Sequence, residues 1–447
     1  DNLELESSNK IIHEFAHGDE PWGWKLPESM NHWHDDRVEK KFYIPKRPMK
    51  VLSVLVPGVI KKEILFVSHL CHPAPAANDN ASGAAMMIEL ANYYKNNPHH
   101  YTIRFLFTVE YWGTVSFLNR YDEILSNIVT VISLDMVGAD QNICGSSMIV
   151  DEIPHHLTSN IDILLFYYLQ NNGKTEKYRA IGNPVQTFTC DFQFYSGGSD
   201  HYIFNTAGIP STCVNTYPDK FYHTAEDTID KISKKTLELF FNTITQAINH
   251  FEENTDKDTQ LLSQLILHRF QEMSSELILR CINTNFFDLN DFLFLINHIQ
   301  NHCKSRINLL NISNDTNTKL TRGLNDEYKS ALNNYFLLLN LNSEYFYTRN
   351  SNSVFYSKKF TGPLSRNKFF KLVNDDEKNR LQEWLSNDSL FFHKVDIAIE
   401  YSSSYSLEEI SILLKYHYFG GEYIHIVKEF FDYLEKYGFL KKIESND

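Results

Sequence analysis

The stretch VSHLCHPAPAANDNASG, from Val67 to Gly83, joins an apolar strand to a helix that begins with small residues. It contains two histidines, a cysteine and an aspartate, all of which can bind metal ions. A histidine at a strand end and an aspartate at a helix start can be held a few ångströms apart, and zinc accepts such nitrogen and oxygen ligands. The stretch therefore predicts a metal site whose remaining ligands lie elsewhere in the chain.

Strands and helices alternate through the first half of the chain. The predicted strands are 63–68, 101–109, 128–134, 147–150 and 211–215, and the predicted helices are 81–94, 112–120, 161–170 and 228–251. Continuous apolar strands that alternate with helices indicate an α/β fold with a mainly parallel sheet. Functional residues in such sheets lie beyond the carboxyl ends of strands, where His69, Glu110 and Asp135 are found.

The length of 447 residues exceeds what one hydrophobic core organises, so more than one domain is expected. Residues 1–60, with tryptophans among Pro and Gly, are expected to form a cap or lid, and residues 61–252 the α/β domain. After a charged linker, residues 253–392 form a helical domain. Residues 393–447 run helix, Gly-Gly turn, helix and short strand, which is the order of a small winged-helix unit.

Charge and composition restrict the possible partners. The chain has 42 Lys+Arg against 56 Asp+Glu, a net charge of -14, which disfavours nucleic acid or an anionic membrane surface as a partner. No apolar run approaches the roughly 20 residues of a membrane span. Six dispersed cysteines without a CxxC pair fit reduced thiols and a cytoplasmic setting.

The winged-helix-like tail also raises the possibility of DNA binding. Its candidate recognition helix carries charges of both signs, and such a mixture would not neutralise phosphates. These charges are Lys428, Glu429, Asp432, Glu435 and Lys436. A packing or protein-contact role is therefore favoured, including contact between copies of the chain through the helical C-terminal region.

Each candidate site residue has an ordinary structural explanation when taken alone. Asp79 suits a helix N-cap, and Asp135 suits a turn. Glu110 suits a solvated strand end, and His223 suits a loop ahead of a capped helix. It is the combination of motifs that favours a shared site.

Six short motifs follow one another along the chain. They are HLC at 69–71, NDN at 78–80, VEYWG at 109–113, SLDMVG at 133–138, SGGSDH at 196–201 and YHT at 222–224. Together they resemble the co-catalytic zinc aminopeptidases of the bacterial leucyl aminopeptidase type, whose superfamily includes glutamate carboxypeptidases and glutaminyl cyclases. The resemblance covers residues 62–251 and, with the helical and winged-helix tail, points to an aminopeptidase-like branch. It implies a three-layer zinc-peptidase domain of the phosphorylase/hydrolase-like kind with a mainly parallel central sheet.

The resemblance implies a role for each matching residue. His69 and Asp135 would bind one zinc ion, His223 would bind the other, and Asp79 would bridge the two. Glu110 would be the general base, with zinc-bound water as the nucleophile.

Asp200 and His201 match a segment that lies near the site in the resembling family. They would orient the site or contact the oxyanion. A helix-capping role is equally compatible with their sequence. Asp227 is expected to cap the following helix and to fix the loop that carries His223.

The sequence departs from the family's pattern at two positions. Cys71 stands where the family has an aspartate that orients the metal site, and Tyr111 stands where it has a glutamate that binds the second zinc. The first site would still have three protein ligands and an open position for water, which is the catalytic zinc pattern.

The second site would keep only Asp79 and His223 unless Glu110, Tyr111 or His72 contributes. We therefore expect one tightly bound zinc ion and a weaker or absent second ion. For His72 two alternatives remain open, a substitute ligand and packing beside the proline that follows it.

The function implied is zinc-dependent hydrolysis of an N-terminal peptide bond or a related amide, with a peptide or small amide as substrate. Two alternatives remain. One is another amide hydrolase or an acyl transfer of the glutaminyl-cyclase type, since the superfamily includes both. The other is a non-catalytic binding or scaffold protein with a degenerate metal site.

Overall fold

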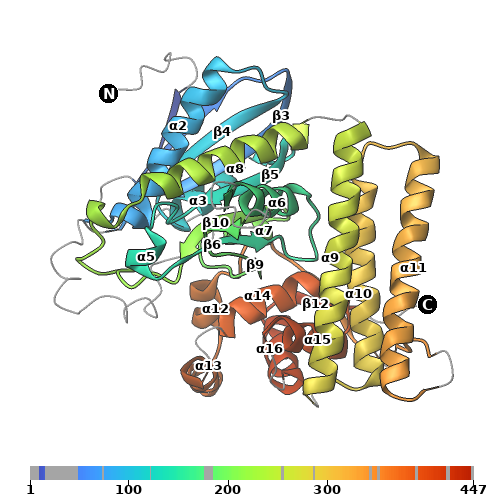
Figure 1. The fold of residues 1–447 in the computed structure, drawn as a ribbon. Coiled ribbons are helices and arrows are strands. Elements are labelled where there is room, and N and C mark those ends of the chain that lie inside the picture. Colours follow the sequence, from blue (N-terminus) through green and yellow to red (C-terminus); the bar gives the residue numbers. More distant parts are fainter. Residues whose placement is uncertain are drawn as a thin grey trace. The chain divides into compact units, whose positions relative to one another are not determined.

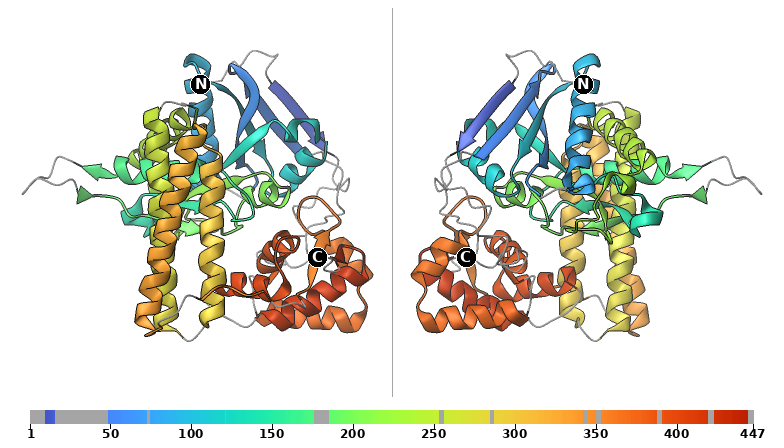
Figure 2. Two further views of the ribbon diagram at one scale, coloured as in Figure 1. Left: turned by 90° about the vertical axis from the view of Figure 1, so that its right-hand side faces the viewer. Right: turned by 90° about the vertical axis from the view of Figure 1, so that its left-hand side faces the viewer.

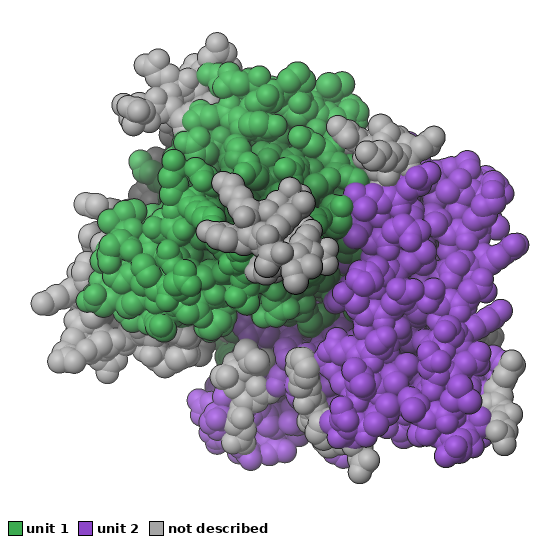
Figure 3. Space-filling view, viewed as in Figure 1, with its two compact units in different colours: residues 1–157, 161–253, 362–371 green, residues 158–160, 254–361, 372–447 purple. Residues whose placement is uncertain are grey.

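The computed structural model describes residues 10–15, 49–72, 75–120, 122–175, 185–252, 256–284, 287–341, 345–349, 353–387, 391–418 and 423–443. The chain forms two compact units (Figure 3). Unit 1 comprises residues 1–157, 161–253 and 362–371, and unit 2 comprises residues 158–160, 254–361 and 372–447. Most of the expected cap at 1–60 lies outside the described residues, and the division into four segments stays a prediction.

Unit 1 is built on a sheet with the strand order β1-β2-β4-β3-β5-β10-β6-β9 (Figure 1). The strands are β1 (Lys10–Phe15), β2 (Met49–Val56), β3 (Ile60–His69), β4 (Tyr101–Thr108), β5 (Ile128–Leu134), β6 (Ser147–Glu152), β9 (Cys190–Phe194) and β10 (Ser211–Tyr217). β4, β3, β5 and β10 are parallel to one another in the centre. Antiparallel pairs join β1 to β2, β2 to β4, and β6 to β10. The predicted α/β fold with a mainly parallel sheet is confirmed.

The central strands are buried on both faces, as continuous apolar strands of a parallel sheet require. β3 is buried from Glu63 to His69, and β4 from Thr102 to Thr108. The helices of this unit are α2 (Gly83–Asn96), α3 (Trp112–Arg120), α4 (Asp122–Leu125), α5 (Gln141–Cys144), α6 (Ile161–Asn172), α7 (His201–Thr206), α8 (Lys234–Glu252) and most of α12 (Arg366–Leu372). A short hairpin joins β7 (Lys174–Thr175) to β8 (Val185–Gln186).

The strand order creates a crevice at the carboxyl ends of β3 and β5. The chain moves from β3 through α2 to β4 in one direction along the sheet, and from β4 through α3 to β5 in the other. Because such crossovers are right-handed, α2 and α3 lie on opposite faces, as Figure 2 shows. Ligands bind in sheets of this kind where the direction of the connections reverses, which here is between β3 and β5.

The predicted helix at 228–251 begins later than expected. A 3₁₀ turn, η4 (Ile229–Lys231), comes first, and α8 starts only at Lys234. The intervening backbone pairs with the segment after β5: Ile232 forms a β-bridge with Ala139, and Ser233 N–H donates to the Gly138 carbonyl at 2.8 Å. These hydrogen bonds replace the first helical turn.

Unit 2 contains three long helices that pack side by side, α9 (Asp256–Asn283), α10 (Leu289–Asn308) and α11 (Asn314–Leu338) (Figure 2). It continues with α13 (Asp375–Asn387), α14 (Phe391–Tyr401), α15 (Leu407–His417), α16 (Ile424–Lys436) and β12 (Leu440–Ile443). β12 pairs antiparallel with β11 (Phe355–Lys358), a strand from outside 393–447. The winged-helix assignment stays a prediction. Among the described residues, no helix has the length and apolar character needed to cross a membrane.

A buried ion pair links two central strands of unit 1. Arg104 on β4 donates from Nε and Nη2 to the two carboxylate oxygens of Glu63 on β3, at 2.6 and 2.8 Å, and from Nη1 to Ser53 Oγ at 2.8 Å. Arg104 and Glu63 are 4% and 6% exposed. Removing one partner would therefore leave the other charged and buried.

We predict that Arg104→Met destabilises the protein by about 3–5 kcal/mol, because Glu63 then loses its only close cation among the described residues. The double variant Arg104→Met with Glu63→Leu should be distinctly less destabilised, since no charge stays buried. Urea unfolding followed by circular dichroism measures both. A single variant no less stable than the double would contradict this account of the pair.

Candidate metal centre

Three of the predicted site residues are aligned by the register of the parallel strands. The pairing of β3 with β5 brings His69 level with Asp135, just past the end of β5. The pairing of β3 with β4 sets His69 opposite Thr108, two residues before Glu110. Strand register alone therefore delivers an imidazole and two carboxylates to one edge of the sheet.

Asp79 lies in a π-helical turn, η3 (Ala77–Ser82), that precedes α2. The asparagine on its C-terminal side fixes this turn to the sheet. Asn80 Nδ2 donates to Ser68 Oγ at 3.0 Å and to the Leu134 carbonyl at 2.9 Å, so it contacts the ends of both β3 and β5. The turn is thereby placed over the crevice between those strands.

The other side of the turn is fixed to the loops that follow β5 and β10. Asn78 Nδ2 donates to Asp219 Oδ2 at 3.0 Å, and Asn78 Oδ1 accepts from Gly138 N–H at 2.9 Å. The Asp227 carboxylate accepts the backbone N–H groups of Asn78 and Asp79, at 2.8 and 3.0 Å. Asp227 was expected to cap the following helix, but its two oxygens accept these N–H groups instead.

One set of possible ligands faces the Oδ1 atom of Asp79. His69 Nε2 lies 3.5 Å from Asp79 Oδ1 and 3.2 Å from Asp135 Oδ1. Bonds of about 2.0–2.1 Å to zinc place neighbouring ligands of a tetrahedron roughly 3.3 Å apart. These three residues therefore have the spacing and the ligand atoms that suit a zinc ion.

A second set faces the other oxygen of the same carboxylate. Asp79 Oδ2 lies 3.1 Å from His223 Nε2 and 3.6 Å from His72 Nε2. The two Nε2 atoms are 3.0 Å apart. The His72 side chain thus faces His223 and Asp79, in the position of a possible ligand.

The electrostatics of the centre favour a bound cation. Asp79, Asp135 and Asp200 are 4%, 8% and 0% exposed, and buried carboxylates are costly without a positive partner. Burial disfavours the charged form of His69, but Asp135, Cys71 and Glu110 together outweigh it and raise the pKa of His69 well above its usual value. Burial likewise opposes the ionised form of Asp135, yet His69 holds its pKa below the usual value. A positive charge is therefore stabilised where the two side chains meet.

Glu110 brings a further carboxylate against the first ligand set. A carboxylate oxygen of Glu110, the Cys71 sulfur and ring nitrogens of His69 and His72 all lie within 4.8 Å of one another. Burial raises the pKa of Glu110 to about 8, the neighbouring carboxylates Asp135, Asp200 and Asp79 act in the same direction, and His69 opposes them. Glu110 can therefore exchange a proton near neutral pH.

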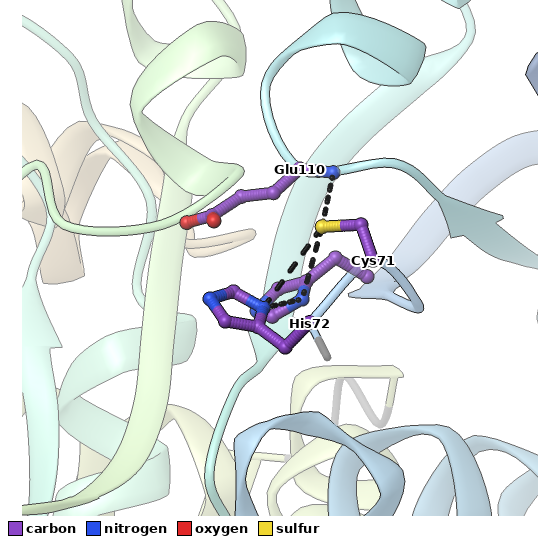
Figure 4. A group of neighbouring side chains, drawn as sticks. Cys71, His72 and Glu110 are labelled. Carbon is purple, nitrogen blue, oxygen red and sulfur yellow. Dashed lines mark hydrogen bonds between the residues drawn. The ribbon is translucent and has the colours of Figure 1, made fainter. Parts of the chain in front are cut away.

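Cys71 occupies the centre of this group. Its sulfur lies 3.9 Å from His72 Nδ1, and it accepts the Glu110 backbone N–H at 3.4 Å (Figure 4). The same sulfur is 3.8 Å from His69 Nδ1. Ligating histidines usually donate their second ring N–H to an acceptor that fixes the ring. Cys71 lies within reach of both rings as such an acceptor, and the two Nδ1 atoms are 3.3 Å from each other.

Tyr111 and Asp200 are linked on the far side of Glu110. Asp200 Oδ1 accepts from Tyr111 N–H at 2.8 Å and from Thr114 Oγ1 at 2.7 Å. The Tyr111 ring packs edge-on against Tyr202. Burial, with Glu110 next, raises the pKa of Tyr111 well above its usual value, so the side chain is a neutral phenol, which is a poor substitute for a carboxylate ligand.

His201 lies apart from the possible ligands. Its Nε2 is 3.3 Å from Asp151 Oδ2, and its ring packs edge-on against Tyr195. It belongs to none of the candidate metal groups among the described residues. The alternative of helix capping by Asp200 is not seen, because Asp200 makes no side-chain cap to α7.

The residues that hold the Asp79 turn in place were not predicted from the sequence. Asn78, Asn80 and Asp219 were not singled out, although all three are fixed into the turn and its surrounding loops. The signal available was the NDN triplet itself: two asparagines beside a candidate ligand, in a stretch of small residues that packs against a sheet.

Histidine and carboxylate groups at the carboxyl ends of parallel strands form a candidate metal centre on an α/β fold. Residues 6–254 match the family described as "Domain of unknown function (DUF4910)", and the chain belongs to this family.

Relatives of this chain carry aminopeptidase names. Aminopeptidase YwaD of Bacillus subtilis is 28% identical over 253 residues, which are 53% of this chain and 52% of the relative. A Clostridium acetobutylicum protein named for polysaccharide biosynthesis and an aminopeptidase-like domain is 28% identical over 201 residues, 44% of this chain and 42% of the relative. The chain thus spans about half the length of the curated relatives it matches. The resemblance to the zinc aminopeptidase superfamily is confirmed.

The chain is also similar to solved structures over part of its length. BSAP, a zinc aminopeptidase from Bacillus subtilis, is 22% identical with a TM-score of 0.40, over 47% of this chain and 52% of that chain. An Acidobacteriales bacterium glutaminyl cyclase is 21% identical with a TM-score of 0.41, over 56% of this chain and 81% of that chain.

We predict that Asp227→Asn lowers the affinity for zinc about 10- to 100-fold, the usual effect of losing a group that positions ligands. The asparagine side chain would place an NH2 group where an Asp227 oxygen now accepts a backbone N–H. Two donors would then face each other, and the turn that carries Asp79 would shift. Competition with a chromogenic chelator measures the affinity.

The matched control is Asp162→Asn. Asp162 is also buried and also accepts two backbone N–H groups, from Ile153 and Ile163, each at 2.9 Å, but it takes no part in the centre. Equal zinc affinity in the two variants would contradict a positioning role for Asp227.

Proposed function

We propose that this chain is a zinc-dependent hydrolase that cleaves an N-terminal peptide bond or a related amide. The observation that carries the proposal is the Glu110 carboxylate near His69, the histidine that forms a ligand set with Asp79 and Asp135. The aminopeptidase names of the relatives support the same reaction class.

His69, Asp79 and Asp135 would hold the catalytic ion. They supply one nitrogen and two carboxylate oxygens, and three protein ligands leave a position open for water or substrate. Zinc bound there would lower the pKa of water toward ~7 and polarise the scissile carbonyl. The shared carboxylate of Asp79 and the buried ring of His69 keep this position rigid.

Glu110 would move the proton. It accepts one from the attacking water and returns it to the amine that leaves as the peptide bond breaks. Burial raises the pKa of Glu110, and a cation held beside His69 would lower it again toward the range of a general base. The Cys71 sulfur, by accepting the Glu110 backbone N–H, fixes the start of the side chain.

The charge of the site suits a substrate with a free amine. Such amines are cations at neutral pH, and several carboxylates gather at this edge of the sheet. The overall charge of -14 adds a field of the same sign, which attracts cationic and disfavours polyanionic ligands.

We predict that Glu110→Gln lowers turnover of aminoacyl-amide and dipeptide substrates about 100- to 10,000-fold. Glutamine has nearly the same shape but cannot accept the proton. The zinc content, measured by mass spectrometry of the purified protein, should not change, and wild-type turnover should be lost with a chelator and regained with zinc.

Glu89→Gln is the control, because Glu89 is an exposed glutamate on α2. Full turnover by Glu110→Gln would sink the assigned mechanism. A wild-type chain that turns over no member of the panel and purifies without zinc would favour the non-catalytic alternative.

A further inference from the structure

We propose that a second metal ion binds between His72, Asp79 and His223. His72 would be the third ligand and would take over from the glutamate that the resembling aminopeptidases have at the position of Tyr111. The proposal rests on the proposed function in one respect, since Asp79 would also bind the first ion. It assigns to His72 a ligand role that has no counterpart in the motifs of the zinc aminopeptidases that the sequence resembles.

The spacing of the three ligand atoms carries the inference. The Nε2 atoms of His72 and His223 are 3.0 Å apart, and Asp79 Oδ2 lies 3.6 and 3.1 Å from them. These distances surround the roughly 3.3 Å that separates neighbouring ligands in a tetrahedral zinc site. Three such atoms facing one point, with a fourth position open, form a complete set of protein ligands for a zinc ion.

Each oxygen of the Asp79 carboxylate faces a different group of possible ligands. Oδ1 is the oxygen near His69, and Oδ2 is the oxygen near both His72 and His223. A carboxylate whose two oxygens face different ligand groups is placed to bridge two cations. The Asp227 carboxylate and the two flanking asparagines hold it in that orientation.

The second nitrogen of the His72 ring also has a suitable partner. Ligation through Nε2 requires the proton on Nδ1, and His72 Nδ1 lies 3.9 Å from the Cys71 sulfur. The same holds for His69, whose Nδ1 is 3.8 Å from that sulfur. The Cys71 sulfur is thus within reach of either ring as an acceptor for an Nδ1 proton, and the two Nδ1 atoms are themselves 3.3 Å apart.

The backbone of the His223 loop is held in a conformation that suits ligation. His223 has φ 57, in the left-handed region that non-glycine residues rarely adopt, and such positions concentrate at functional sites. The ring stacks on Tyr222 with centroids 3.7 Å apart. Its Nε2 is thereby kept toward Asp79.

The two sites differ in access to solvent. The side chains of His72 and His223 are 18% and 27% exposed, whereas that of His69 is 1% exposed. The second ion would therefore exchange faster and be removed first by a chelator. This agrees with the expectation of one tight and one weaker ion and identifies the ligands of the weaker one.

A competing arrangement uses Cys71 as a ligand together with His72, Glu110 and His69. The ring nitrogens near the Cys71 sulfur are the Nδ1 atoms, whereas the Nε2 atoms are the ones near Asp79. The competing arrangement would place the cation away from Asp79, one of the buried carboxylates that need compensation. The set of His72, Asp79 and His223 is favoured for that reason.

The test is the zinc content of wild type, His72→Ala, His72→Gln, His223→Ala and His69→Ala after equilibration with buffered zinc and gel filtration. We expect two ions in wild type and one in each His72 and His223 variant. The control is His268→Ala, which removes an exposed histidine of α9 and should keep both ions. Thermal unfolding of the metal-free proteins confirms that each variant folds.

Cobalt substitution gives a second readout that does not depend on activity. The wild-type protein should bind two cobalt ions and show no sulfur-to-cobalt charge-transfer band. In His72→Ala the visible absorption of one of the two ions should be lost. One ion per chain in wild type, or a second ion that persists in both His72 variants, would overturn the proposal while leaving the first site intact. A charge-transfer band lost in Cys71→Ser would overturn it in favour of the competing arrangement. No bound metal at all would overturn the proposed function as well.

Discussion

The centre depends on the position of one carboxylate, that of Asp79. A single side chain faces two groups of ligands only if its backbone is held in place, and here that backbone is held by Asp227, Asn78 and Asn80. Burial makes this arrangement demanding, since a buried carboxylate without compensation is costly. The same burial makes the site attractive to a cation. The hydrogen bonds of the turn thus hold a buried carboxylate where a bound cation would compensate its charge.

The sheet supplies the other half of the centre without special backbone features. Parallel strands in register bring His69, Asp135 and Thr108, two residues before Glu110, to one edge. The reversal of the connections between β3 and β5 leaves that edge open. The loops after β3 and β10 then bring His72 and His223 from the solvent side, so the buried part of the centre comes from strands and the accessible part from loops. This division explains why the two ligand sets differ in exposure.

The sequence was informative where regular structure decides the outcome. His69, Glu110 and Asp135 follow buried strands, so their place at the sheet edge could be predicted from the apolar pattern. The start of the helix after residue 228 could not be predicted, because hydrogen bonds of Ser233 and Lys231 with the segment after β5 replace the first turn. No local pattern encodes such pairing.

The same limit applies to the loop residues. The sequence left His72 as either a ligand or a packing residue, and the choice depends on the path of the chain after β3 and on the contact with His223. Asp227 was recognised as fixing the loop of His223, but the backbone groups it would accept could not be read from the sequence. Asp219 gave no signal at all, because its partner Asn78 lies far away along the chain.

The most direct test of this account is anomalous diffraction at the zinc edge from crystals of the zinc-loaded protein. The account predicts one strong peak among His69, Asp79 and Asp135, and a second among His72, Asp79 and His223. Peaks only at other residues, or none at Asp79, would contradict it.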